Sequence, residues 1–337
     1  MTTKSLVITS IAADDNPVLR IFAAACGERG VPFIVIGDTK SPEHFALEGC
    51  DYWSINRQKE LPFALAELLP YRHYARKNLG YLIAMQQGSE RILETDDDNL
   101  PREGFWQERD REVRCRYFEN QGWVNVYHYF SPRQVWPRGF PLDAVQKPQA
   151  DIDAMPERLV SCPIQQGLPD ENPDVDAVYR LTYPLPLTFS DGPSLGLGAN
   201  AWSPFNSQNT LWFPEAFPLL YLPSYCSIRM TDIWRSFIAQ RIAWENGWAV
   251  LYHQPTVWQE RNEHNLLRDF EDEISGYLHN GRICHLLEAL ALKPGMEQIP
   301  DNLRRCYNLF IRENLIDARE KPLLDAWLED VGRLVSD

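Results

Sequence analysis

The stretch "RILETDDDNLP", Arg91 to Pro101, follows a short apolar run with three adjacent carboxylates, Asp96, Asp97 and Asp98. Neighbouring carboxylates repel one another, so a cation, several hydrogen-bond donors or bulk water must offset the repulsion. The preceding "SERIL" is strand-like, which places the aspartates at the carboxyl end of a strand. Such a cluster suits Mg²⁺ or Mn²⁺, which favour oxygen ligands. A solvated turn is the alternative, because "DDDN" before Pro101 is also favourable turn chemistry.

The first hundred residues alternate between strand-like and helical stretches. "KSLVITSI" and "VPFIVIGD" are strand-like, and "NPVLRIFAAACGERG" between them has helical spacing, with Pro17 near its start and Gly30 after its end. Two further helical stretches, "ELPFALAELL" and "RKNLGYLIAMQQG", precede the acidic strand. This alternation predicts an α/β fold with a parallel sheet, helices on both faces and ligands at the carboxyl ends of the strands.

The pattern changes twice further along the chain. Residues from about 104 to 163 are irregular, and helical spacing dominates from residue 266 onward. We therefore predict a first domain over residues 1–265, with an insertion at about 104–163, and a helical C-terminal region over 266–337. The apolar and acidic faces of that region suggest packing against the first domain or against a second copy, so a homo-oligomer is possible.

The composition excludes several classes of partner. The 47 acidic residues outnumber the 33 basic ones and give a net charge of −14, which argues against nucleic acid or anionic membrane as a partner. No apolar run approaches the ~20 residues that span a bilayer, and the start of the chain does not resemble a signal peptide. The seven cysteines contain no C-x-x-C pair, so neither a disulfide framework nor a zinc site is indicated. We expect a cytoplasmic protein.

A basic cluster interrupts this acidic sequence. The stretch "RHYARKNLGY" brings Arg72, Arg76, Lys77 and Asn78 to the start of the helix that leads into the acidic strand. Cations beside a helix N-terminus form an anion site, so a diphosphate is expected between this helix and a metal on the aspartates. The alternative is a set of basic residues on a solvated helix face.

These motifs together carry a family resemblance. "RKNLGYLIAMQQGSERILETDDDNLP" resembles the nucleotide-binding and aspartate-motif segment of GT-A glycosyltransferases, especially the reversibly glycosylated polypeptides. "PFNSQNTLWFPEAFPLLYLP" and "RMTDIWRSFIAQRIAW" resemble the STELLO family of plant Golgi proteins and its bacterial relatives. The resemblance covers residues 4–266 and implies a GT-A fold, a Rossmann-like nucleotide-sugar-binding domain. The plant proteins are membrane-anchored, whereas we expect no anchor here.

The resemblance also implies roles for the acidic triplet. Asp98 is the first choice for a ligand of Mn²⁺ or Mg²⁺, Asp96 would contact the metal or the ribose, and Asp97 would contribute to nucleotide binding. GT-A enzymes often supply a third metal ligand after a late strand, and His253 and His264 follow the strand-like "WAVLY". A lone histidine is more often structural. The residues that would bind the nucleoside or the diphosphate are Thr9, Ser10, Asp38, Arg76, Lys77 and Asn78.

Asp232 is the candidate catalytic residue, because many GT-A enzymes carry an acidic residue at the start of a comparable helix. Its carboxylate would act as a base or orient the acceptor hydroxyl. The alternative is a structural role, since an acidic residue at a helix start favours the helix dipole. Amide side chains suit sugar hydroxyls because they both donate and accept hydrogen bonds. The candidate substrate contacts are Asp174, Asp176, Asn206, Gln208, Asn209, Arg229 and Arg235.

The combined interpretation is a metal-dependent glycosyltransferase that moves a sugar from a UDP-sugar to a saccharide or glycoconjugate acceptor. The same resemblance permits a UDP-sugar mutase, which would return an isomeric UDP-sugar. A third possibility is a non-catalytic GT-A scaffold that binds nucleotide or organises partners without transferring sugar.

Overall fold

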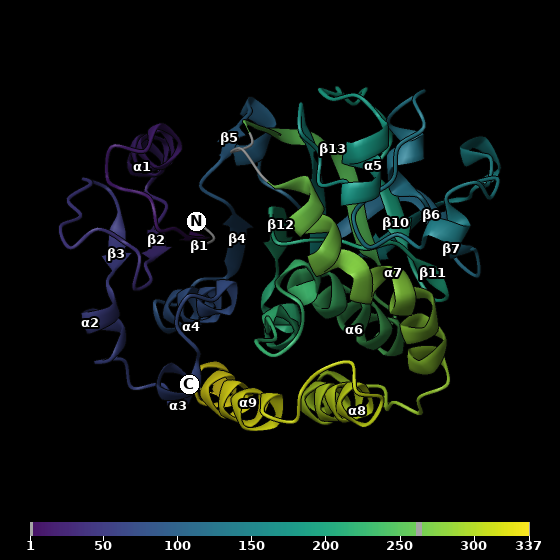
Figure 1. The fold of residues 1–337 in the computed structure, drawn as a ribbon. Coiled ribbons are helices and arrows are strands. Elements are labelled where there is room, and N and C mark those ends of the chain that lie inside the picture. The colour runs from purple at the N-terminus through teal and green to yellow at the C-terminus, as the bar shows by residue number, and fades with distance from the viewer. Residues whose placement is uncertain (1–2, 261–264, 337) are drawn as a thin grey trace.

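The computed structural model describes residues 3–260 and 265–336 (Figure 1). A twisted sheet runs through its centre, and helices lie on both faces. The strands are β1 (Lys4–Thr9), β2 (Phe33–Ile36), β3 (Asp51–Trp53), β4 (Arg91–Thr95), β5 (Asn99–Pro101), β6 (Glu112–Phe118), β7 (Gly122–Trp123), β8 (Glu157–Ser161), β9 (Ile164–Asp170), β10 (Leu195–Leu197), β11 (Ala201–Trp202), β12 (Asn209–Trp212) and β13 (Val250–Gln259). The α-helices are α1 (Pro17–Arg29), α2 (Ile55–Gln58), α3 (Ala64–Leu68), α4 (Lys77–Gln86), α5 (Ala177–Thr182), α6 (Thr231–Glu245), α7 (Leu266–Glu288), α8 (Ile299–Arg312) and α9 (Glu320–Ser336).

The main sheet has the strand order β3-β2-β1-β4-β12-β9-β13-β10-β6-β8. The first four strands are all parallel, as their alternation with helices predicted. Beyond β4 the sheet is mixed, because β12 runs antiparallel to both β4 and β9, and β10 runs antiparallel to β13. The expected α/β fold is therefore confirmed, with a Rossmann-like N-terminal half consistent with a GT-A domain, but the sheet is not parallel throughout.

Local sequence explains how α1 and α4 cover the two faces of the sheet. The α1 helix begins after Asn16, whose side chain accepts a hydrogen bond from Leu19 N at 2.9 Å, and ends at Gly30, which has a φ of 63°. The α4 helix lies so close to the sheet that a Cβ on Gly80 would stand 2.5 Å from Val7. Such an approach requires glycine.

The predicted insertion at residues 104–163 contributes to the same sheet. Within it, β6 and β8 pair with each other and form one edge of the sheet. The stretch between β7 and β8 consists mainly of short 3₁₀ turns and loops. Its buried apolar residues belong to the core cluster that also contains α4 and α6. This irregular segment supplies one residue, Arg138, to the cavity described below.

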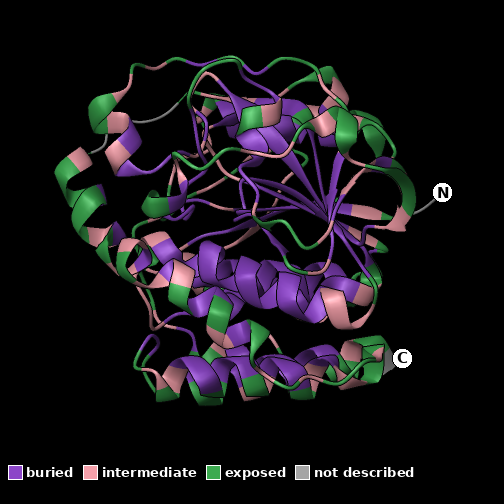
Figure 2. Cartoon of the chain, turned by 90° about the vertical axis from the view of Figure 1, so that its right-hand side faces the viewer, coloured by how far each residue is buried: buried purple, intermediate pink, exposed green. Residues whose placement is uncertain are grey.

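The last two helices, α8 and α9, form an outer layer beneath α4 and α6 (Figure 1). Figure 2 shows helices next to the sheet that are largely buried, and outer helices that expose one side to solvent. One apolar cluster joins the layers, with Trp327 of α9 and Phe310 of α8 beside Tyr221 and Trp234. The predicted domain boundary between residues 265 and 266 coincides with the start of α7. The division of the chain into two domains stays a prediction.

Buried carboxylates reinforce the contact between the outer layer and the rest of the chain. Glu320 accepts hydrogen bonds from the backbone of Ser224 and Tyr225, at 2.9 and 2.7 Å. Asp330 accepts from Ala64 N and Leu65 N, at 3.0 and 2.9 Å, and so caps the start of α3. Within residues 3–260 and 265–336, no helix has both the length and the apolar character needed to cross a membrane.

Trp327→Ala tests whether the outer layer belongs to the main folding unit. The indole is fully buried and donates to the Pro218 carbonyl at 2.9 Å, so its loss should lower the free energy of unfolding by about 3–5 kcal/mol. Urea denaturation should show one transition for wild type and variant. Val335→Ala on the exposed side of α9 is the control and should change stability by less than about 0.5 kcal/mol. A separate early transition in the variant would show that the helices fold as their own unit.

Candidate functional site

A cavity of about 570 Å³ opens where β1, β2 and β4 end. Residues from distant parts of the chain meet in its wall, including the start of α6 and the first turns of α7. The sequence-predicted site residues that line it are Thr9, Ser10, Asp38, Arg76, Asp96, Asp97, Asp98, Asp174, Gln208, Arg229 and Asp232. Those that lie off its wall are Lys77, Asn78, Asp176, Asn206, Asn209, Arg235 and His253. His264 lies outside the described residues.

The charge of this wall is mixed and predominantly acidic. Among the described residues, the lining aspartates are Asp38, Asp96, Asp97, Asp98, Asp174, Asp232, Asp269 and Asp272. The lining cations are Lys40, Arg72, Arg76, Arg138 and Arg229. The carboxylates therefore repel an anionic ligand that approaches the cations, and a bound cation or a proton would reduce this repulsion.

Two carboxylates of the acidic triplet are held by fixed donors. Asp96 accepts hydrogen bonds from the Tyr74 hydroxyl at 2.9 Å and from Lys77 Nζ at 3.1 Å. Asp97 accepts from the Ser10 hydroxyl. Burial raises the pKa of both carboxyl groups above their usual range, and these donors oppose that shift. Both side chains are therefore oriented before any ligand binds.

The third carboxylate, Asp98, connects the triplet with the end of β13. It accepts hydrogen bonds from Asn99 Nδ2 at 3.1 Å and from Gln259 Nε2 at 2.8 Å. All three aspartates thus lie half-buried on the wall of one cavity, and Asp97 and Asp98 form the turn between β4 and β5. Nevertheless, no group of three or more His, Cys, Asp or Glu side chains converges as a ready metal site within residues 3–260 and 265–336.

Three members of the basic cluster, Arg76, Lys77 and Asn78, are buried, whereas Arg72 is exposed. Lys77 is fully buried and donates to the Thr95 carbonyl at 2.7 Å and to the Ser207 carbonyl at 3.0 Å, besides Asp96. Asn78 exchanges two hydrogen bonds of 2.9 Å with the backbone of Leu222. Lys77 therefore supports the acidic triplet from behind, and Asn78 fastens α4 to a loop.

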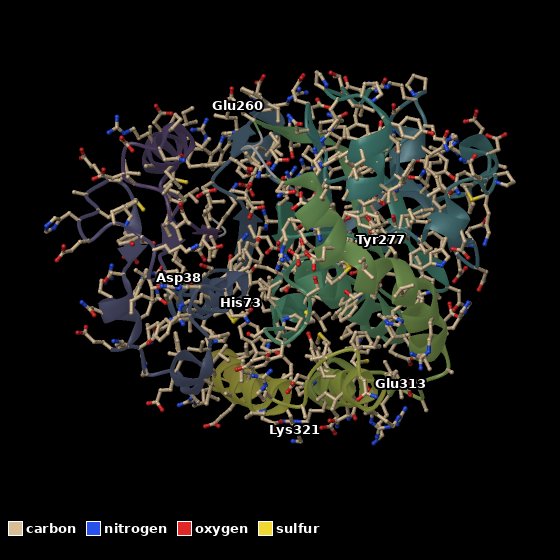
Figure 3. The ribbon with its side chains drawn as sticks, viewed as in Figure 1. Asp38, His73, Glu260, Tyr277, Glu313 and Lys321 are labelled. Atoms are coloured by element: carbon tan, nitrogen blue, oxygen red, sulfur yellow. The ribbon has the colours of Figure 1, made fainter. Side chains whose placement is uncertain are left out.

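Arg76 and Arg72 are the members of that cluster that line the cavity, and Arg76 is held there by buried partners. Its Nε donates to Gln58 Oε1 at 2.9 Å and its Nη1 to the Leu69 carbonyl at 3.1 Å. Nearby, His73 N donates to Asp38 Oδ2 at 3.0 Å, and Figure 3 shows the two side chains close together. Burial lowers the pKa of His73, so its imidazole is neutral near neutral pH.

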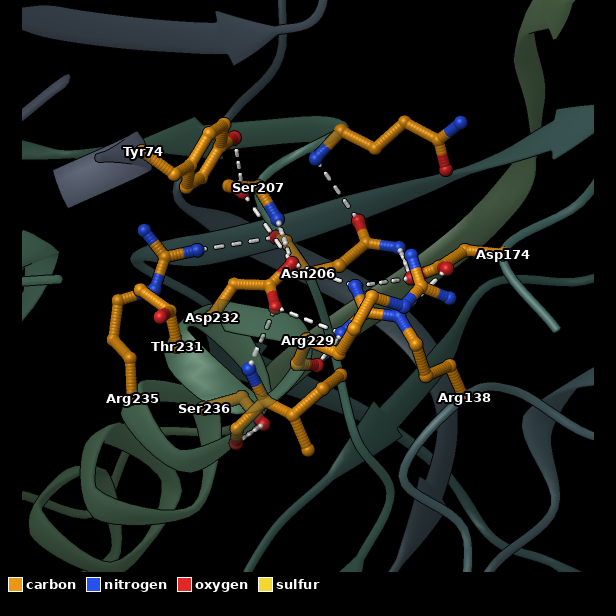
Figure 4. A network of polar contacts seen from close by, with 12 residues as sticks. Tyr74, Arg138, Asp174, Asn206, Ser207, Arg229, Thr231, Asp232, Arg235 and Ser236 are labelled. Atoms are coloured by element: carbon orange, nitrogen blue, oxygen red, sulfur yellow. Dashed lines mark hydrogen bonds and ion pairs between the residues drawn. The ribbon is translucent and has the colours of Figure 1, made fainter. Parts of the chain in front are cut away.

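The start of α6 carries the main ionic network of the cavity (Figure 4). The Arg138 guanidinium donates to Asp232 at 3.0 and 2.9 Å, and to Asp174 twice at 2.8 Å. Burial raises the pKa of Asp174, but the charge of Arg138 outweighs burial and holds that pKa below its usual range. One buried cation therefore orients two carboxylates from different parts of the chain.

Asp232 also keeps the helical position that favours a structural role. It lies in the first turn of α6, where the helix dipole favours a negative charge, and its Oδ1 accepts from Ile233 N at 3.0 Å. Ser207 approaches its Oδ2 at 3.4 Å through both the backbone N–H and the hydroxyl. The side chain is thus both part of the helix start and part of the cavity wall.

The remaining arginines and amides take separate roles. Arg229 pairs with Glu273 of α7 at 2.6 Å and lines the cavity, whereas Arg235 pairs with the buried Glu94 at 2.9 Å away from it. Asn206 donates to Asp174 at 2.8 Å and so supports the network from behind. Asn209 donates to Thr256 Oγ1 at 2.8 Å, remote from the cavity.

Two buried polar atoms in residues that line the cavity have no hydrogen-bond partner among residues 3–260 and 265–336. They are Thr9 Oγ1 at the end of β1 and Gln208 Oε1 before β12. A buried polar atom without a partner costs free energy, so a donor from water or from a ligand is expected at each. Gln208 is itself held in place, because its Nε2 donates to Asn99 Oδ1 at 2.8 Å.

Two predicted site residues have structural surroundings. Asp176 caps α5, where it accepts from Tyr179 N at 2.7 Å and from the Trp136 indole at 2.6 Å. Burial lowers the pKa of His253 to about 3, helped by the charge of Arg109, so this histidine is neutral and lies off the cavity.

Several residues of the wall were not predicted from the sequence, above all Arg138. It lies in the irregular segment, where no periodicity indicates which side chains are buried. One signal was present: "VWPRGFPL" sets a single arginine among apolar and aromatic residues. A buried arginine requires carboxylate partners, so this context indicates an ion pair with distant acidic residues. There was no comparable indication in the sequence for Tyr74, for Ser207 or for the α7 aspartates.

Comparisons with known proteins agree with the sequence motifs. The family model described as STELLO glycosyltransferases matches residues 229–336, which include Asp232 and the outer helices. "Probable glycosyltransferase STELLO2" of Arabidopsis thaliana is 29% identical over 322 residues, covering 90% of this chain and 42% of the relative. "Probable glycosyltransferase STELLO1" of the same plant is 28% identical over 322 residues, covering 90% and 41%. The chain thus spans about two fifths of these curated relatives. A mycobacterial protein of known crystal structure aligns with a TM-score of 0.42 and 11% identity over 83% of this chain and 75% of its own.

Asp176→Asn tests whether Asp176 has the structural role of capping α5. Burial raises the pKa of Asp176 from 3.8 to about 7, so the folded protein keeps a proton that the unfolded chain loses. The resulting stabilisation is complete below about pH 4 and disappears as the pH rises through about 7. The variant lacks this titration, and its free energy of unfolding should fall less than that of wild type between about pH 5 and 7.

Urea denaturation across that pH range measures the difference. Asp153→Asn is the control, because Asp153 is exposed and its variant should keep the slope of wild type. Equal slopes for Asp176→Asn and wild type would contradict the assignment.

Proposed function

We propose that this STELLO-like chain is a glycosyltransferase that moves a sugar from a metal-bound UDP-sugar to a saccharide acceptor. The observation that carries the proposal is the meeting of three features in one cavity: the acidic triplet, the cations near α4, and the Asp232–Arg138–Asp174 network. The names of the two plant relatives and of the matching family support glycosyl transfer as the reaction.

The nucleoside would lie at the ends of β1 and β2. Thr9 Oγ1 has no partner in the part of the chain that the structure describes and suits a base or ribose group, and Asp38 lines the same part of the wall. Arg76 and the neighbouring Arg72 would then face the diphosphate. Guanidinium groups suit this role because they stay charged and match the geometry of phosphate oxygens.

The acidic triplet fits a divalent cation by its chemistry. Asp96 and Asp98 supply carboxylate oxygens to the cavity wall, and hard cations such as Mg²⁺ and Mn²⁺ prefer oxygen ligands. Such ions commonly bind through one or two carboxylates together with substrate phosphates and water, so a complete protein cage is not required. A bound cation would neutralise charge on the departing UDP. His253 lies off the cavity wall and has no part in the proposed metal site.

The acceptor hydroxyl would meet Asp232. Arg138 donates hydrogen bonds to both oxygens of this carboxylate. The Ser207 hydroxyl contacts one of the same oxygens from another side. A carboxylate fixed in this way is a preorganised hydrogen-bond acceptor, which orients a hydroxyl and receives its proton as the new glycosidic bond forms. The cavity would thus hold the donor near the acidic triplet and the acceptor near the start of α6.

Product analysis tests the reaction itself. The protein would be incubated with Mn²⁺, a panel of UDP-sugars and a panel of oligosaccharides, and the products separated by mass and chromatography. Release of UDP with an extended saccharide supports transfer. An isomeric UDP-sugar would replace the proposal with a mutase, and binding of UDP without any turnover would replace it with a scaffold.

Binding of UDP should require a divalent metal, because the carboxylates and the diphosphate repel one another without a cation between them. Calorimetry should therefore show UDP affinity with Mn²⁺ and a loss of about 10-fold or more with EDTA or in Asp98→Asn. Asp153→Asn, which removes an exposed charge outside the cavity, should bind as wild type does. Equal UDP affinity with Mn²⁺ and with EDTA would remove the metal from the proposal.

Asp232→Asn separates acceptor chemistry from helix stabilisation. The variant keeps the size of the side chain but loses its charge, so turnover should fall on the order of 10²-fold while UDP affinity stays within about twofold. The lost ion pair with Arg138 should also lower stability by about 1–3 kcal/mol.

Asp176→Asn provides the matched control, because Asp176 also begins a helix but lies off the cavity. It should retain near-normal turnover. Near-normal sugar transfer by Asp232→Asn, together with a lower melting temperature, would make Asp232 structural.

A further inference from the structure

A second hollow, of about 680 Å³, lies at the surface beyond the acidic triplet. It surrounds the end of β13, and the label Glu260 in Figure 3 marks one of its lining residues. The residues that shape its wall are Arg102, Glu171, Leu185, Pro186, Trp258 and Gln259. None of them was a candidate in the sequence analysis.

Gln259 connects this hollow with the candidate active site, because it lines both. Its Nε2 donates to Asp98 Oδ2 at 2.8 Å, so one side chain separates the hollow from the acidic triplet. A molecule lying in the hollow would therefore have one end beside the triplet, where the donor sugar is expected. The remainder of that molecule would extend over the surface.

The walls of the hollow are held by backbone pairing. Trp258 sits in β13 between two strands, opposite Leu100 of β5 and Asp170 of β9. Glu171 and Leu187 exchange two backbone hydrogen bonds of 2.9 and 3.0 Å, which brings the segment with Pro186 alongside the end of β9. Backbone pairing thus holds Trp258 and the segment with Pro186 in place at the ends of β13 and β9.

Its chemistry combines an aromatic face with charged and amide groups. Trp258 is half-buried, and Leu185 and Pro186 add apolar surface. Arg102 pairs with Asp170 and keeps 40% of its side chain exposed, and Asn172 Nδ2 donates to the Gln259 carbonyl at 3.2 Å. Saccharides present apolar C–H faces and a rim of hydroxyls, so they match an indole flanked by hydrogen-bonding side chains.

We propose that this hollow is the acceptor subsite, which holds a saccharide with one ring against Trp258 and its hydroxyls toward Arg102 and Glu171. The proposal rests on the proposed function, since it assigns the acceptor of that reaction to a place. The terminal sugar would pass Gln259 to reach Asp232, and the more distant sugars would occupy the hollow.

Trp258→Ala tests the proposal in the transfer assay. The acceptor KM should rise about 10-fold or more, because the stacking surface is lost, while UDP affinity with Mn²⁺ stays within about twofold. Trp53→Ala is the matched control: Trp53 is also half-buried in a strand, but it lies at the other end of the sheet and lines neither hollow. It should leave the acceptor KM unchanged. An unchanged acceptor KM in Trp258→Ala would overturn the proposal.

A binding experiment separates failure of this proposal from failure of the proposed function. The full chain would be labelled with 5-fluorotryptophan, the Trp258 resonance assigned from Trp258→Phe, and cellotetraose and maltotetraose titrated in the presence of UDP and Mn²⁺. A shift of the Trp258 resonance by either saccharide supports a saccharide subsite even if no sugar is transferred. No shift of that resonance by either saccharide, while UDP binds, would overturn the subsite.

Discussion

The buried guanidinium of Arg138 is the interaction on which the candidate active site depends. A buried charge is costly unless it is paired and hydrogen-bonded, and Arg138 meets that condition with four hydrogen bonds of 2.8–3.0 Å to Asp174 and Asp232. The three residues come from the irregular segment, from the loop before α5 and from α6. Three separate parts of the chain therefore have to be in place before the network can form, and the network in turn fixes the direction of Asp232.

A second ion pair extends this constraint into the C-terminal region. Arg229 pairs with the fully buried Glu273 of α7, and Glu273 also accepts a hydrogen bond from Ala177 N at 2.7 Å. Further along α7, Asn280 donates a hydrogen bond of 2.8 Å to the carbonyl of Gly139, the residue next to Arg138. The helix α7 thus fixes both sides of the network and forms part of the cavity wall. In this structure the region that begins at residue 266 contributes to the site as well as to the outer layer.

The features that the sequence could predict are those that depend on neighbouring residues. A β-branched run, a proline near a helix start and an acidic turn are local, and they located β1, α1 and the triplet Asp96 to Asp98. The direction of a polar side chain is not local. Lys77 and Asn78 stand beside Arg76 in the sequence, yet Lys77 points behind the triplet and Asn78 binds Leu222, 144 positions away. Arg138 escaped prediction for the same reason, because its partner Asp232 lies 94 positions further along the chain.

The charge of the cavity bears on which ligands it would select. Its lining aspartates outnumber its lining arginines and lysine among the described residues, and the whole chain carries a net charge of −14. Free phosphate or a nucleotide without a cation would meet net repulsion at the acidic triplet before it reached Arg76. In the proposed donor complex the metal removes that repulsion only where the diphosphate and the triplet meet. In that proposed complex the acidity of the cavity would discriminate between ligands, because it would admit the anion together with its cation and reject the anion alone.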